Sequence, residues 1–100
     1  MEMEEEIMSL IIHSGEARSY SMEAIAAAKE GKIEEANALI VKADEELGVA
    51  HNTQTSLIQA EAGGKKIPMS LLMVHAQDHF MTSMTLKDLA KELIEIHAKF

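Results

Sequence analysis

Apolar residues recur every three or four positions along most of the chain, which is the pattern of amphipathic helices. In a first segment, about residues 4–30, they are Ile7, Leu10, Ile11, Ala17, Ala24, Ile25 and Ala28. In a second segment, about residues 33–62, they are Ile33, Ala36, Leu39, Ile40, Ala43, Leu47 and Ala50. Between the two, Gly31 follows Lys29 at a position where a helix commonly ends in a left-handed residue. The pattern predicts two long helices joined by a tight turn.

The segment GGKKIP, residues 63–68, separates the second helix from a third, which we expect at about residues 68–99. Paired glycines end a helix, and Pro68 suits the first turn of the next because its missing N–H is not used there. Alternating patterns typical of strands have little support. Long helices with short loops predict an all-α, antiparallel, up-down-up three-helix bundle, with residues 1–100 forming a single domain.

The third predicted helix is apolar on nearly every side. Between Pro68 and Leu86 its only formally charged side chain is Asp78. Two neighbouring helices cannot cover such a helix completely, so we expect part of its surface to meet further copies of the chain. The candidate seam has a heptad-like spacing: Leu71, His75, Asp78, Thr82, Thr85, Leu89 and Ile96. Asp78 carboxylates that converge there must be neutralised by protons or by a hard cation such as Mg²⁺.

Composition and charge exclude several classes of protein. The chain has 100 residues, 47% of them apolar, with no cysteine and a formal net charge of −8. Disulfides, thiolate metal sites and cysteine nucleophiles are therefore excluded, and nucleic acids and anionic membranes are poor partners. The N-terminus is acidic, unlike a signal peptide, and no uncharged apolar run reaches the ~20 residues of a membrane span. We expect a soluble, cytoplasmic protein.

The segment VHAQDHFMTSM, residues 74–84, carries the candidate chemistry. Neutral imidazole is a good nucleophile and metal ligand near pH 7, so His75 is a candidate phosphoryl acceptor. A histidine at an interface, with its hydrogen bonds satisfied there, explains the same residue without any chemistry. His75 and His79 have the spacing of a helical zinc pair, although no glutamate follows His75 as in the known zinc motif.

The other histidines, His13, His51 and His97, have no spacing partner, and we interpret them as structural or surface residues. His51 and Gln54, one helical turn apart, could form a polar bridge within the bundle.

Three segments together resemble a known family. LIIHSGEARSYSMEAI, AHNTQTSLIQAEAG and MSLLMVHAQDHFMTSMTLKDLAKELIEIH are similar to the IIA component of the lactose/cellobiose/N,N'-diacetylchitobiose class of the bacterial sugar phosphotransferase system. The resemblance covers about residues 4–98. His13 stands where asparagine is expected in relatives, so its role is left open.

The resemblance implies a nine-helix homotrimer and a role for each residue of the segment. His75 would accept a phosphoryl group on Nε2 from the histidine phosphocarrier protein and pass it to a cysteine of the cognate IIB. His79 and Gln77 would support it, and Asp78 would bind a metal, predicted to be Mg²⁺, with its two symmetry mates. The sugar would be a β-linked disaccharide of the cellobiose, chitobiose or lactose type.

Two interpretations without phosphoryl transfer remain open from the residues alone. One is a helical interaction module, although no repeat with a period of about 30–50 residues is visible. The other is an oligomeric metal-binding bundle that uses His75, Asp78 and His79.

Overall fold

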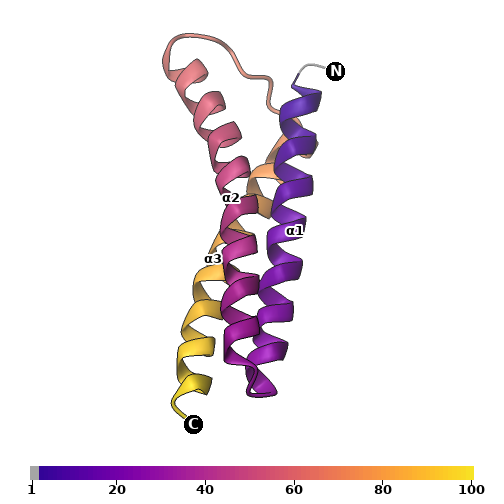
Figure 1. The fold of residues 1–100 in the computed structure, drawn as a ribbon. Helices are drawn as coiled ribbons and strands as arrows, with labels where there is room; N and C mark the ends of the chain where they lie inside the picture. The colour runs from indigo at the N-terminus through magenta and orange to yellow at the C-terminus, as the bar shows by residue number, and fades with distance from the viewer. Residues whose placement is uncertain (1–2) are drawn as a thin grey trace.

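The computed structural model describes residues 3–100 as a bundle of three helices (Figure 1). Helix α1 spans Glu4–Lys29, α2 spans Ile33–Ala62 and α3 spans Leu71–Ala98. Successive helices run in opposite directions, and the start of α1 and the end of α3 lie at opposite ends of the bundle (Figure 1). No strand occurs within residues 3–100. The predicted all-α, up-down-up architecture is confirmed.

The first two helices match their predicted bounds to within one residue, but the third begins later than predicted. Residues 65–70 are not helical, so Pro68 lies outside the first turn of α3. Ser70 is the N-cap: its backbone is extended, and its Oγ accepts the N–H of Met73 at 3.1 Å. A serine oxygen satisfies an N–H that the helix itself leaves free, which fixes the start of α3 at Leu71.

Glycines terminate both of the other helices, as predicted. Gly31 has a φ of +79° and Gly64 a φ of +99°, a conformation that favours glycine. After α1, the N–H of Lys32 returns to the carbonyl of Ala27 at 3.0 Å. After α2, the N–H of Lys65 returns to the carbonyl of Ala60 at 3.0 Å. These bonds satisfy carbonyls at the helix ends and turn the chain sharply.

Buried small residues repeat every seven positions in each helix. They are Ala17 and Ala24 in α1, Ala36, Ala43 and Ala50 in α2, and Ala76, Ser83 and Ala90 in α3. Small side chains let helix backbones approach closely, and a seven-residue repeat keeps them facing the same neighbours along the bundle. Larger side chains fill the layers between them, with Ile7, Leu10, Met73 and Phe80 all but inaccessible to solvent.

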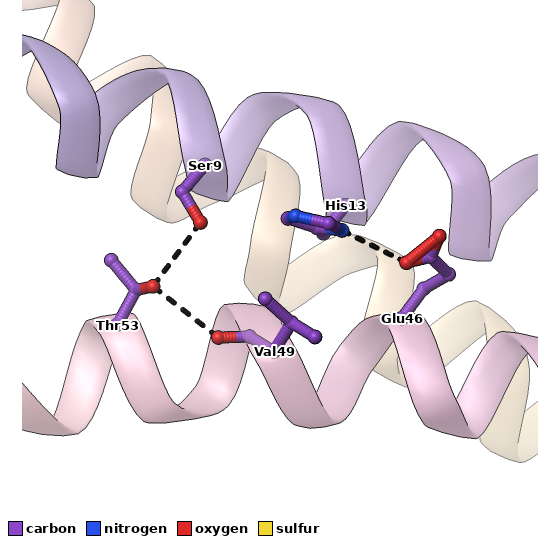
Figure 2. Close-up of polar contacts among 5 residues, drawn as sticks. All are labelled: Ser9, His13, Glu46, Val49 and Thr53. Carbon is purple, nitrogen blue, oxygen red and sulfur yellow. Dashed lines mark hydrogen bonds and ion pairs between the residues drawn. The ribbon is translucent and has the colours of Figure 1, made fainter.

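Polar contacts connect α1 to α2 on one side of this core (Figure 2). His13 Nδ1 lies 2.8 Å from Glu46 Oε2, and both side chains are partly exposed. The hydroxyl groups of Ser9 and Thr53 are 3.2 Å apart, and Thr53 also donates to the carbonyl of Val49 at 3.3 Å. The role that the sequence left open for His13 thus includes a contact between helices.

One outer face of α3 is uncovered in the single chain. Every residue of the predicted seam is exposed, including Leu71, Leu89 and Ile96. Helix α1 also exposes apolar side chains, among them Met8, Ile12 and Met22. Burial of α3 on all sides would therefore require other chains. No helix within residues 3–100 combines the length and hydropathy needed to cross a membrane.

Candidate functional site

Three candidate residues lie on the same outward face of α3. His75, Asp78 and His79 are three and four positions apart, which places them within one turn of each other. His75 and Asp78 are exposed, whereas His79 is half-buried. The rings of His75 and His79 are nearly parallel, with an interplanar angle of 10° and centroids 6.0 Å apart. The structure thus brings the two imidazole rings together, as the sequence spacing predicted.

His79 extends from this face toward α1. An ideal Cβ built on Gly15 would lie 3.5 Å from Nε2 of His79. The imidazole therefore occupies space next to the α1 backbone that most side chains at position 15 would fill. Gly15 was not predicted to belong to the site, because nothing in the local sequence pattern shows which residue of α3 it contacts.

Gln77 points away from His75. Two residues along a helix correspond to a rotation of about 200°, so Gln77 faces α2 instead. Its Oε1 accepts a hydrogen bond from Nε2 of Gln54 at 2.8 Å, and its own Nε2 lies 3.9 Å from Sδ of Met73. Gln54 also approaches Sδ of Met81 at 3.6 Å. Any support that Gln77 gives to His75 within this chain must act through the position of α3.

His51 and Gln54, which could have formed a polar bridge, instead each make an ordinary intramolecular hydrogen bond with another residue. Nε2 of His51 lies 3.5 Å from the hydroxyl of Thr55, and its ring is 6.4 Å from that of Phe80. Gln54 bonds across the bundle to Gln77 because it lies on the side of α2 that faces α3. Spacing along α2 gives no information about that partner.

His75 itself is an accessible nucleophile. It lies in the second turn of α3, and neither ring nitrogen has a hydrogen-bond partner within residues 3–100. No acidic residue occupies the first turn of α3, whereas α1 and α2 both begin with glutamates. A phosphoryl group on His75 would thus meet no carboxylate in the preceding turn. The chemistry available is attack by a free imidazole nitrogen on an electrophile brought by another molecule.

A metal site is not complete in the single chain. Within residues 3–100, no three His, Asp or Glu side chains are placed to hold one ion together. Asp78 uses its backbone carbonyl to accept a hydrogen bond from Thr82 at 2.9 Å, while its carboxylate has no partner among the described residues. That carboxylate is available for a ligand or for another chain.

A family model described as "PTS system, Lactose/Cellobiose specific IIA subunit" matches residues 5–98. The chain belongs to this family. The lichenan-specific phosphotransferase enzyme IIA component of Bacillus subtilis (strain 168) is 58% identical over 98% of this chain and 89% of its own length. The IIA component is thus a phosphoryl-transfer protein of the sugar phosphotransferase system, and the predicted family is confirmed.

Solved structures of IIA proteins share the fold. The PTS cellobiose-specific enzyme IIA from Bacillus anthracis superposes with a TM-score of 0.95 at 47% identity, covering 99% of this chain and 91% of that one. The IIA(Chitobiose)–HPr complex of the Escherichia coli phosphotransferase system gives a TM-score of 0.83 at 46% identity, covering 99% and 96%. These relatives favour a phosphocarrier over a helical interaction module.

Proposed function

We propose that this IIA component carries a phosphoryl group on His75, which it receives from the histidine phosphocarrier protein HPr and passes to a cysteine of its cognate IIB. The observation that carries the proposal is the exposed imidazole of His75 on the outward face of α3, with ring nitrogens that are not hydrogen-bonded to any residue that the structure describes. A IIA relative of the same fold was solved in complex with HPr, which supports HPr as the donor.

The chemistry consists of two in-line displacements. In the first, the lone pair of Nε2 of neutral His75 attacks the phosphorus of the donor phosphohistidine. A P–N bond to His75 forms while the donor P–N bond breaks, and its electron pair returns to the donor imidazole. In the second, the thiolate of IIB attacks the same phosphorus: a P–S bond forms while the P–N bond to His75 breaks, and its electron pair returns to Nε2 of His75. Each step depends on positioning the two proteins and on charge complementarity.

The transported sugar is proposed to be a β-linked disaccharide of the cellobiose, chitobiose or lactose type. Relatives are named for lichenan, for cellobiose and for N,N'-diacetylchitobiose, which support this class of sugar. The relay would operate in the cytoplasm, where its donor and acceptor domains would meet it.

The assembly is proposed to be a homotrimer of nine helices. The exposed α3 seam and the apolar residues of α1 supply surfaces that further copies could cover. Asp78 fits a shared metal site, since its exposed carboxylate lacks a partner among residues 3–100 and oxygen ligands suit Mg²⁺. Asp78 from each of the three subunits would hold the ion, which would neutralise the converging carboxylates.

Intact-mass spectrometry tests the relay directly. The protein would be incubated with phosphoenolpyruvate, enzyme I and HPr, and then analysed under alkaline conditions that preserve phosphohistidine. We expect one added phosphoryl group per chain in the wild type and none in His75→Ala. His97→Ala is the matched control, because His97 lies at the other end of α3, and it should be phosphorylated like the wild type. An unmodified wild type, with HPr shown active on a control IIA, would contradict the proposal.

A further inference from the structure

Gly15 and Gly48 each lie inside a long helix, where glycine costs stability relative to alanine. Neither has a positive φ, so the backbone does not require glycine at either position. Their surroundings differ. A Cβ at Gly48 would meet nothing within 4 Å, whereas a Cβ at Gly15 would lie 3.5 Å from Nε2 of His79. Only Gly15 therefore contacts the candidate site.

We propose that Gly15 is a positioning residue for phosphoryl transfer, because its missing side chain lets the ring of His79 lie against α1 and parallel to His75. The proposal rests on the function proposed for His75. The proposal gives His79 a defined role: its ring packs beside His75, the phosphoryl acceptor, and contact with α1 fixes the orientation of that ring.

The contacts support each step of this argument. His79 is half-buried, and neither of its ring nitrogens is hydrogen-bonded to a described residue, so packing is what orients the ring. The ring has two neighbours: an ideal Cβ at Gly15 of α1 would lie 3.5 Å from its Nε2, and the centroid of the parallel His75 ring is 6.0 Å away. A side chain larger than a methyl group at position 15 would enter the space of the imidazole. His79 would then have to rotate, and the parallel arrangement with His75 would be lost.

The size of the side chain at position 15 should therefore determine how far a substitution lowers the rate of phosphoryl transfer. A contact of 3.5 Å is an ordinary van der Waals distance, so Gly15→Ala should leave His79 in place. Gly15→Leu adds atoms beyond Cβ that reach the ring. In-line transfer is sensitive to small displacements of the nucleophile, and misplacement by about 1 Å can lower a rate about 100-fold.

Transfer from phosphorylated HPr, measured by rapid quench, tests the proposal. We expect Gly15→Leu to lower kcat at least about 10-fold, and Gly15→Ala to stay within about twofold of the wild type. Gly48→Leu adds the same side chain at an exposed position where a Cβ has no neighbour within 4 Å, so it should also stay within about twofold. A wild-type rate for Gly15→Leu, or an equal loss in Gly48→Leu, would overturn the proposal.

A double mutant separates positioning from general disruption of α1. If Gly15 acts through His79, then Gly15→Leu combined with His79→Ala should be no slower than His79→Ala alone. If the fold-decreases in rate of the two single variants multiply in the double mutant, Gly15 acts independently of His79 and the proposal is overturned. Circular dichroism and sedimentation confirm that each variant is folded and assembled. Gly15→Val, whose Cγ atoms approach the same ring, replaces Gly15→Leu should that variant fail to fold or assemble.

The ring signals of His75 give a readout that does not require phosphoryl transfer. Nitrogen-15 NMR should show shifted ring resonances for His75 in Gly15→Leu and unshifted ones in Gly15→Ala and Gly48→Leu. Unshifted resonances in Gly15→Leu would overturn the proposed positioning. If the wild type is not phosphorylated at all, the proposed function fails, while these spectra still decide whether Gly15 orients the histidine pair.

Discussion

At the scale of single residues, Lys87 forms the ionic connection between α2 and α3. Its Nζ lies 2.8 Å from Oδ1 of Asp44 and 2.9 Å from Oδ1 of Asp88. The hydrogen bond that Lys87 donates to Asp44 raises the pKa of Lys87 above its ordinary value; burial opposes this, and the hydrogen bond to Asp88 adds to it. The charged form of this lysine is therefore favoured by folding.

Lys87→Met should lower the free energy of unfolding by about 0.5–1 kcal/mol near pH 7, because both carboxylates are substantially exposed and water screens the pairs. Lys87 has a raised pKa in the folded state, so its contribution is complete below the ordinary lysine pKa. It should disappear as the pH rises through the raised value. Urea unfolding across this alkaline range measures the difference. Lys91→Met, one turn later and exposed, should show almost no effect; an equal loss would contradict the assignment.

The residues of the site were predictable to different degrees. Spacings of three and four along one helix were sufficient to place His75, Asp78 and His79 on one face. The contacts of His79 with Gly15 and of Gln77 with Gln54 depend on the rotation and register of separate helices. A local pattern contains no such information, so these partners became visible only in three dimensions.

At the scale of the elements, the start of α3 shows how two local signals compete. Pro68 is compatible with a first helical turn, but Ser70 supplies an oxygen that accepts the N–H of Met73. The capping bond stabilises a helix that begins at Leu71. Proline in the first turn only avoids the loss of a helical hydrogen bond that its missing N–H causes elsewhere in a helix. The hydrophobic periodicity predicted the type of each helix and the bounds of α1 and α2, and the cap decided where α3 begins.

Ser70→Ala should lower the free energy of unfolding by about 1 kcal/mol, because it leaves the N–H of Met73 without its partner. Ser70→Asp retains an accepting oxygen and should restore most of that stability. Chemical denaturation followed by circular dichroism measures both. Ser56→Ala, at an exposed position inside α2, is the control and should be neutral or slightly stabilising. No difference between Ser70→Ala and this control would show that the cap is energetically unimportant.

At the scale of the whole molecule, the exposed apolar face of α3 should determine the oligomeric state. Leu89 on the predicted seam is 57% exposed in the single chain, and Val41 on α2 is 56% exposed. Their equal exposure makes them a matched pair. Leu89→Asp would bury a charge in a subunit interface, which is costly without a partner, whereas Val41→Asp would leave its charge in water.

Sedimentation velocity should therefore find smaller species for Leu89→Asp, with Val41→Asp still assembled. Asp78→Leu should remain assembled, because it removes the carboxylates that converge on the proposed axis. Dissociation of Val41→Asp but not of Leu89→Asp would place the interface on α2. Dissociation of Asp78→Leu would instead assign that aspartate a necessary part in assembly.

The opposite placement of the start of α1 and the end of α3 has a practical consequence for attaching reporters (Figure 1). His75 lies near the start of α3, and Met3 packs against the core cluster that contains Met73 and Ala76 on either side of it, whereas Phe100 is roughly 35–40 Å away along the helix. A fluorescent protein fused after Phe100 would leave the histidine face clear for visiting proteins. The same fusion before Met3 would crowd that face. Comparing the phosphoryl-transfer rates of the two fusions therefore reports how much space the donor and acceptor proteins need around His75.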